Sequence, residues 1–548
     1  MNNLGTISRQ EWRRVMIFAS GFMLITLIPY LIGWLSAGSR WEFGGFLFGA
    51  DDGYSYLAKM RLGARGDWLF TIRYTAEAHD GALLFLPYIL LGRLTSFFVA
   101  SDNPDLPTAL AITFHMARMF FGFALILVSY RFVAVFLRRP GTRMLALVLI
   151  TLGGGFGWLL GLLGLGDLFD TLPVDFIVPE GYTFLILFGL PHLALARCAM
   201  LIGFLLLFRG LQTPGDGRGW LRWSIFAGLC WIVMGLCVPF YIAVVYLVLG
   251  CWGLAVWLRT RQFPWPLLWR AVIAALVVLP LLIYSTLVFA TNEVMGQWSS
   301  QNTLPSPHPL HYVFGYVVLA IPAVAALRWA WKKGDLPSHF PHVLLAVWVV
   351  VMPMVVYLPI NVQRRLAEGV IVPLAILAAA GLRLMAPHRR QWRRARVIMV
   401  ALVVPTAILF WLGGTFNALN PHRPLFHPEN ELAAMDALNR AVPRDSVVLS
   451  LKETGNYLPV RTDLIAYVGH GPETIHADEK EELVAQFFAG ELDETARNDL
   501  LKDVDYVFFG LLEQEKSGTL DPAWAQGLRL LPLDLPDSPV MVYEVPHD

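Results

Sequence analysis

The chain has 548 residues, of which 56% are hydrophobic and only 15% are charged, and its mean hydropathy is +0.56. Soluble globular proteins carry about 25% charged residues. The composition therefore excludes an ordinary soluble domain and indicates a protein that crosses a membrane several times, with no nucleic-acid partner expected.

Charge is distributed unevenly along the chain. Residues 420–548 hold 24 of the 41 acidic residues but 10 of the 42 basic ones. The preceding residues, 1–419, hold 32 basic and 17 acidic residues, a net charge of +15. This asymmetry predicts a basic transmembrane domain over 1–419, followed by an acidic, water-soluble domain over 420–548.

Apolar runs long enough to cross a bilayer recur through the predicted transmembrane domain. The first run is long and lacks a clear cleavage site, so we expect a signal anchor rather than a removed signal peptide. We predict about eleven helical spans. They cover residues 15–36, 110–137, 144–165, 183–208, 223–239, 241–258, 266–290, 310–330, 342–360, 367–385 and 397–418.

Arginine clusters orient these spans, because positive charge marks cytoplasmic loops. Clusters occur near Arg13, near Arg138 and between Arg389 and Arg396. They predict a cytoplasmic N-terminus and, with an odd number of spans, an extracytoplasmic C-terminal domain in a multi-pass protein of the cytoplasmic (inner) membrane. Residues 83–100 do not fit this parity and contain Arg93, which is costly at mid-bilayer. We expect them to form an outer juxtamembrane or re-entrant helix.

The C-terminal segment alternates helical and strand patterns. Short β-branched runs predict strands within 445–451, 463–470 and 505–510. Helical apolar spacing predicts helices over 431–442, 476–490 and 493–504. We therefore expect a small α/β domain.

Two adjacent carboxylates, Asp51 and Asp52, stand out in the first predicted outer loop, residues 37–82. Side by side they resist joint ionisation unless a cation lies near. One could act as a base, and both could bind a divalent ion such as Mg²⁺ or Mn²⁺. The sequence Asp-Asp-Gly is also an ordinary signal for a turn or a helix N-cap.

Basic and aromatic side chains near the predicted outer face form a second group of candidates. Arg118, Arg364 and Arg365 could bind a lipid phosphate through bidentate contacts. Each could equally snorkel or hold helices together, and the same holds for Arg197. Trp68 could stack on a sugar or anchor the loop at the interface.

The first outer loop resembles that of the GT-C superfamily of polyprenyl-phosphate-dependent glycosyltransferases. Gly66-Asp67-Trp68 follow the pair Asp51-Asp52 at the spacing seen in the branch that contains the aminoarabinose transferases and protein O-mannosyltransferases. The span "ARMFFGFALILVSYRFVAVFLRRPG" is similar in carrying Arg118 near its start and a basic cluster at its end. "RRLAEGVIVPLAILAAAGL" resembles the late basic, Pro-containing span. Asp52 departs from the pattern, which usually has Glu there.

The resemblance implies a membrane glycosyltransferase with a GT-C fold. It would move a sugar from a polyprenyl-phosphate-linked donor to a lipid, glycan or protein acceptor at the outer face. Asp51 would be the general base, Asp52 would position the acceptor or a divalent ion, and no cofactor is demanded. The remaining predicted substrate-binding residues are Arg118, Arg364, Arg365, Trp68, His79 and His192.

Two other classes stay open from the sequence. The chain could be a non-catalytic, accessory subunit of a membrane complex, with the acidic C-terminal domain as the docking surface for a protein partner. It could also transport lipid-linked sugars, although we find no inverted repeat of the kind such transporters use.

Overall fold

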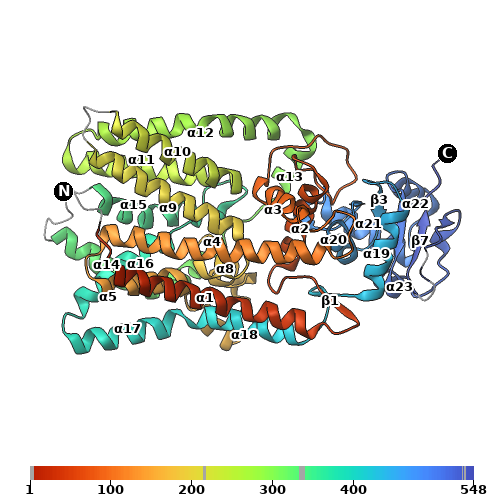
Figure 1. The fold of residues 1–548 in the computed structure, drawn as a ribbon, viewed down its shortest axis with the longest axis horizontal. Coiled ribbons are helices and arrows are strands. Elements are labelled where there is room, and N and C mark those ends of the chain that lie inside the picture. Colours follow the sequence, from red (N-terminus) through yellow and green to blue (C-terminus); the bar gives the residue numbers. More distant parts are fainter. Residues whose placement is uncertain (1–4, 214–217, 333–339, 534, 536–537, 548) are drawn as a thin grey trace. The chain divides into compact units, whose positions relative to one another are not determined.

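The computed structural model describes residues 5–213, 218–332, 340–533, 535 and 538–547. It divides into two compact units, each built from several stretches of the chain (Figure 1). Unit 1 comprises residues 1–27, 117–286 and 303–413, and unit 2 comprises residues 28–116, 287–302 and 414–548.

Unit 1 is helical throughout the residues that the structure describes. Four helices belong partly to unit 1 and partly to unit 2: α1 (Arg9–Ser36), α4 (Leu106–Phe136), α12 (Trp265–Thr291) and α18 (Pro405–Leu419). The other helices of unit 1 are α5 (Pro140–Leu152), α6 (Gly157–Leu162), η1 (Leu168–Asp170), α7 (Val174–Ile177), α8 (Thr183–Gly189), α9 (Pro191–Gln212), α10 (Gly219–Cys237), α11 (Tyr241–Thr260), α14 (Pro309–Lys332), α15 (Phe340–Val355), η2 (Gln363–Ala367), α16 (Ile371–Met385) and α17 (Arg389–Val403).

The helices confirm a multi-pass membrane protein. Among the described residues, seven helices are long and apolar enough to cross a bilayer. The pair α17 and α18, bent by 43°, makes an eighth candidate, and α5, α15 and α16 are shorter apolar helices. The predicted spans overlap helices of the structure, but several are broken, and seven or eight rather than eleven are long and apolar enough to cross a bilayer.

One break shows how unit 1 accommodates a non-helical backbone. The predicted span 144–165 is divided between α5 and α6 at Gly153–Gly155. The buried carboxylate of Asp175 accepts hydrogen bonds from the backbone N–H of Gly155 (2.8 Å) and from the hydroxyl of Thr406 (2.8 Å). A break at membrane depth is tolerated when protein groups satisfy the released backbone donors, so Asp175 has a structural role here.

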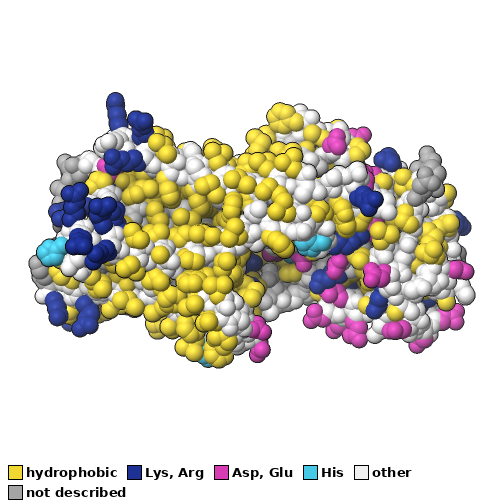
Figure 2. Space-filling view, turned by 90° about the horizontal axis from the view of Figure 1, so that it is seen from below, with side chains coloured by type: hydrophobic (Ala, Val, Ile, Leu, Met, Phe, Trp, Pro, Cys, Tyr) yellow, Lys and Arg dark blue, Asp and Glu magenta, His cyan; other side chains and the backbone are white. Residues whose placement is uncertain are grey.

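The surface of unit 1 agrees with a membrane environment. Large apolar side chains such as Ile17 and Leu276 are more than half exposed. In the space-filling view, apolar side chains cover a broad area, and Lys and Arg side chains gather at one end of it (Figure 2). This pattern is expected when apolar helices face lipid and their basic ends lie on the cytoplasmic side.

Unit 2 combines the first loop with the C-terminal segment. The first loop contributes β1 (Trp41–Phe43), α2 (Ala50–Arg65) and α3 (Leu86–Ser96), and α13 (Glu293–Gln301) comes from the middle of the chain. The C-terminal segment contributes β2 (Phe426–Pro428), α19 (Glu429–Ala441), β3 (Val447–Leu449), α20 (Lys452–Arg461), β4 (Ile465–Ala466), η3 (Gly471–Glu473), α21 (Ala477–Ala489), α22 (Glu494–Leu501), β5 (Tyr506–Phe509), α23 (Leu511–Ser517), η4 (Ala523–Ala525), β6 (Arg529–Leu530) and β7 (Met541–Glu544).

The C-terminal segment forms the predicted α/β arrangement. Its sheet has the order β4-β3-β5-β7-β6, in which β3, β4 and β5 are parallel and β7 is antiparallel to both its neighbours. The three predicted strands are confirmed as β3, β4 and β5. The sequence patterns do not predict the strands β6 and β7 or the helix α20, because Pro459 and the short, polar ends of these elements hide their periodicity.

A second, two-stranded sheet joins the first loop to the C-terminal segment. β1 pairs with β2 in antiparallel register, with Glu42 opposite His427. Aromatic side chains of both segments pack in one core, where the rings of Tyr54 and Tyr457 lie 5.0 Å apart. The first loop is thus folded against the C-terminal segment rather than being a free connection.

Helix α3 lies within residues 83–100, for which an outer juxtamembrane or re-entrant helix is predicted. Its 11 residues extend about 16 Å, roughly half of the 30 Å hydrocarbon thickness. α3 packs closely on α2 because glycines remove side-chain bulk from both helices. A Cβ on Gly92 would collide with the carbonyl oxygen of Met60, and a Cβ on Gly63 with that of Ile89.

This close approach makes Gly92→Ala a test of the packing of α2 on α3. The added methyl group must push the two helices apart, and overpacking of this kind costs about 1–3 kcal/mol. We expect a lower midpoint in thermal unfolding of the detergent-solubilised protein. Gly250→Ala in α11 is the matched control, because nothing lies within 4 Å of a Cβ there. An equal effect of the two substitutions would contradict the packing described.

Candidate active site

The acidic pair lies at the start of a helix rather than in a turn. Asp51 and Asp52 occupy the first turn of α2, and Gly49 before it adopts a left-handed conformation (φ 55°) that turns the chain into the helix. Both carboxylates are exposed. Negative charge is favourable at this position because the helix dipole is positive at its N-terminus.

The following turns of α2 carry a buried polar face. Asp52, Ser55 and Lys59 recur at the spacing that puts residues on one side of a helix. Ser55 and Lys59 are almost completely buried, with exposed fractions of 0% and 1%. A lysine is rarely buried to this extent without a partner, and the partner comes from the C-terminal segment.

Glu473 of η3 is that partner. Its Oε1 atom accepts a hydrogen bond from the Lys59 ammonium at 2.5 Å and another from the Ser55 hydroxyl at 2.6 Å. The carboxylate is itself buried. Aromatic rings line the cation, and the ring centre of Phe85 is 4.4 Å from Lys59 Nζ. The pair ties α2 to the C-terminal segment inside unit 2.

His470 connects this buried pair to the acidic pair. Its Nε2 atom lies 3.0 Å from Oδ1 of Asp52, and its Nδ1 atom lies 3.3 Å from Oε1 of Glu473. Burial lowers the pKa of His470, but Asp52 and Glu473 outweigh burial and raise that pKa to about 9. The imidazole is therefore protonated at neutral pH and pairs with both carboxylates.

The contacts among Lys59, Glu473 and His470 also set the pKa values of the buried pair Lys59 and Glu473. Burial raises the pKa of Glu473, but Lys59 and His470 outweigh it and lower that pKa to about 2. Burial also lowers the pKa of Lys59, against the opposing effect of Glu473. The site thus holds one buried carboxylate between two cationic groups, with Asp52 at its exposed end.

Asp51 has a different neighbour. Its Oδ1 atom accepts a hydrogen bond from the side-chain amide of Asn456 at 3.2 Å. Asn456 lies in α20, and its backbone carbonyl accepts a hydrogen bond from the Tyr74 hydroxyl at 3.2 Å. Asp51 is thus oriented by a neutral group, whereas Asp52 is held by a cation.

A divalent ion at Asp51 and Asp52 stays a prediction. Over the ranges that the structure describes, no group of three or more His, Cys, Asp or Glu side chains could hold a metal ion. His470, which is protonated, lies 3.0 Å from Asp52 and repels a cation. We therefore derive no chemical step through a metal.

Two other predicted residues of the first loop have local partners. The guanidinium of Arg93 stacks on Trp68 at 3.9 Å from the ring centre, and Trp68 is 56% exposed. The backbone N–H of Ile72 donates to Nε2 of His79 (2.9 Å), and Nδ1 of His79 lies 2.8 Å from the carbonyl oxygen of Glu77. Both ring nitrogens of His79 are thus engaged by the backbone of its own loop.

The predicted phosphate-binding residues belong to unit 1. Arg118 is buried and donates to the Thr26 hydroxyl and the Leu187 carbonyl, both at 2.9 Å. Arg364 and Arg365 are half-buried in η2.

Arg365 lies 3.6 Å from Glu180, and His192 is half-buried as the second residue of α9. Arg197 forms a fully buried, two-point ion pair with Glu368, at 2.6 and 2.8 Å. Among the roles that the sequence leaves open for Arg197, this contact supports that of holding helices together.

The sequence patterns do not point to Ser55, Lys59, Asn456, His470 or Glu473. A signal for the first two is present, because Asp52, Ser55 and Lys59 fall on one helical face once the segment is taken as a helix. The three C-terminal residues give no such signal. They reach α2 across about four hundred residues of chain, and local patterns do not contain such contacts.

The fold of the chain is similar to that of solved oligosaccharyltransferases, in agreement with the predicted resemblance at the level of the fold. An oligosaccharyltransferase from Archaeoglobus fulgidus, tethered to an acceptor peptide with an NVT sequon, superposes with a TM-score of 0.54 at 14% identity. The match covers 98% of this chain and 74% of that one. No protein-family model matches the chain, and no curated protein matches it.

Two further solved structures are similar. The archaeal oligosaccharyltransferase AglB from Archaeoglobus fulgidus, in complex with an inhibitory peptide and a dolichol-phosphate, has a TM-score of 0.52 at 14% identity, over 90% of this chain and 69% of that one. ArnT from Cupriavidus metallidurans, in the apo state, has a TM-score of 0.48 at 14% identity, over 95% of this chain and 97% of that one.

The protonated state of His470 predicts a pH dependence of stability. The folded-state pKa of about 9 lies above the ordinary value near 6.5. Protonation of His470 therefore stabilises the folded chain fully below about pH 6.5, and this contribution is lost as pH rises through about 9. It is on the order of 3 kcal/mol, since one pKa unit corresponds to about 1.4 kcal/mol.

We expect His470→Gln to lower the thermal unfolding midpoint at pH 6 and to reduce its fall between pH 6.5 and 9. His476→Gln is the control, because that imidazole is more than half exposed. The wild-type midpoint should fall more steeply over this range than that of His470→Gln. Equal slopes would show that the imidazolium of His470 does not pair with Asp52 and Glu473 in the folded chain.

Proposed function

We propose that the chain is a membrane glycosyltransferase that moves a sugar from a polyprenyl-phosphate-linked donor to an acceptor on the outer face of the cytoplasmic membrane. The observation that carries the proposal is the exposed acidic pair at the start of α2, held by Asn456 of α20 and by His470, the residue before η3. The solved oligosaccharyltransferases of similar fold contain an acceptor peptide in one case and a dolichol-phosphate in another. They support a lipid-phosphate carrier as the donor.

The proposed reaction needs a base. An acceptor hydroxyl oxygen attacks the anomeric carbon of the sugar, and the bond between that carbon and the carrier phosphate breaks. The electron pair of this bond leaves with the phosphate, and the acceptor proton passes to a carboxylate. We assign this proton to Asp51.

The contacts favour Asp51 over Asp52 as the base. Asp51 is exposed and has a neutral amide as its neighbour. It can take up a proton without breaking an ion pair. Asp52 would have to give up its contact with the imidazolium of His470. Asp52 is therefore suited to a positioning role, and it keeps the negative charge that holds His470.

The departing phosphate needs positive charge. The residues predicted to bind this phosphate are still Arg118, Arg364 and Arg365. The residues predicted to contact the sugar or the lipid are still Trp68, His79 and His192. In this proposal the N-terminus is cytoplasmic, and residues 420–548 are extracytoplasmic. An accessory subunit on the same scaffold is the alternative, and it would make no use of a base.

Asp51→Asn separates these functions without knowledge of the sugar. In cells that carry the variant in place of the natural gene, the unused donor should accumulate as in a deletion strain. Loss of a general base slows a reaction by about 10²–10⁴-fold. Mass spectrometry of extracted polyprenyl-phosphate lipids measures the accumulation, and immunoblotting of membranes confirms that the variant is present.

Asp80→Asn is the matched control, because it removes the same charge from an exposed residue of the same loop. It should leave the lipid profile at the wild-type level. A wild-type profile in Asp51→Asn cells would exclude Asp51 as the base. A deletion strain with no change in any polyprenyl-phosphate sugar would contradict the transferase proposal itself.

A further inference from the structure

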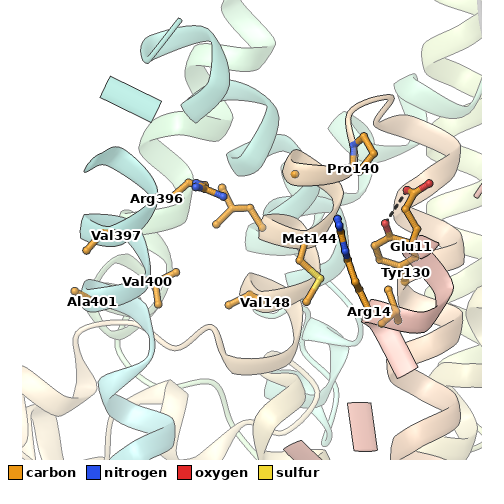
Figure 3. A pocket seen from close by; sticks show the side chains of 13 residues that line it. Glu11, Arg14, Tyr130, Pro140, Met144, Val148, Arg396, Val397, Val400 and Ala401 are labelled. Atoms are coloured by element: carbon orange, nitrogen blue, oxygen red, sulfur yellow. Dashed lines mark hydrogen bonds between the residues drawn. The ribbon is translucent and has the colours of Figure 1, made fainter. Parts of the chain in front are cut away.

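A pocket in unit 1 combines positive charge with an apolar wall. It lies between α1, the end of α4, the start of α5 and α17, and its volume is about 680 Å³. The side chains of Arg14 from α1 and Arg396 from α17 both line it (Figure 3). None of the residues that line the pocket is among those assigned above.

The positive charges of Arg14 and Arg396 are not balanced by Glu11, the acidic residue that lines the pocket. Glu11, which also lines the pocket, is taken up by Arg143 at 3.0 Å and by the Tyr130 hydroxyl at 3.0 Å (Figure 3). Within the described residues, no carboxylate lies within ion-pair distance of Arg14 or Arg396. The pocket therefore presents two cationic groups to whatever enters it.

Arg396 carries a further sign of a missing partner. Its Nε atom is buried and has no hydrogen-bond acceptor. A buried donor without an acceptor is unfavourable, so an acceptor atom supplied by a ligand would remove this cost. Trp392, one turn earlier on α17, lies under the guanidinium with its ring centre 5.4 Å away. The ring restricts where that guanidinium can go.

The opposite part of the pocket is apolar. Met144 and Val148 of α5 lie across from Val400 of α17, and Val397 lies on the side of α17 turned away from α5 (Figure 3). Val397 is 69% exposed, and its neighbour Ile398 is 60% exposed, so the apolar wall continues onto the surface that faces lipid. A free anion would leave this wall in contact with water, whereas an acyl chain would cover it.

We propose that this pocket binds an anionic glycerophospholipid of the cytoplasmic leaflet. The phosphate group would lie between Arg14 and Arg396, with one acyl chain along Val148 and Val400. Basic pockets between transmembrane helices on the cytoplasmic side bind anionic head groups in this way. The site would fix α17 against α1 and α5.

Lipid binding to the full-length protein in a neutral detergent tests this proposal, with native mass spectrometry as the readout. Dioleoylphosphatidylglycerol should bind to the wild-type protein, and Arg14→Gln and Arg396→Gln should each weaken binding about five-fold. Arg394→Gln is the matched control, because Arg394 is an exposed residue of α17 that does not line the pocket. It should bind the lipid as the wild type does.

A second variant keeps both arginines. Val400→Trp fills the apolar half, so it should weaken binding of the lipid and leave any binding of inorganic phosphate unchanged. Equal binding of dioleoylphosphatidylcholine would overturn the proposal, as would an equal loss in Arg394→Gln. Displacement of the lipid by inorganic phosphate at matching affinity would assign the pocket to a free anion instead.

Discussion

The buried ion pair between Lys59 and Glu473 is the interaction on which the candidate active site depends. It joins the first loop to the C-terminal segment at 2.5 Å, with both groups almost completely excluded from solvent. A charge in such a place is stable only beside its partner, since removing one member leaves the other buried and uncompensated. The pair therefore fixes α2, and with it the acidic pair at the start of α2.

The uneven charge of the chain finds a physical explanation in unit 2. Cationic residues of the first loop face acidic residues of the C-terminal segment at short range. Arg61 pairs with Asp463 at 2.8 Å, and Arg73 pairs with Asp445 at 2.6 Å. The acidic C-terminal segment is thus in part a counter-charge for the first loop. This arrangement gives the segment a structural part in the site, besides any contact with another protein.

Much of the fold can be predicted from the sequence, because apolar runs indicate the membrane spans and arginine clusters indicate the loops between them. The parallel strands β3, β4 and β5 can also be predicted, from their β-branched runs. The helix α2 cannot, since Asp51-Asp52-Gly53 is equally a turn signal and polar residues interrupt the apolar pattern of the helix. The partners of the acidic pair, Asn456 and His470, cannot be predicted either, because long-range contacts leave no trace in local spacing.

A double-mutant cycle on Lys59 and Glu473 tests most directly whether the C-terminal segment holds α2. Glu473→Met should lower the free energy of unfolding by about 3–5 kcal/mol, since it leaves the Lys59 ammonium buried without its carboxylate. Lys59→Met should lower it by less, since His470 still pairs with Glu473. The double variant should lose much less than the sum, with a coupling free energy of about 2 kcal/mol or more. Additive losses, with no coupling, would contradict the account.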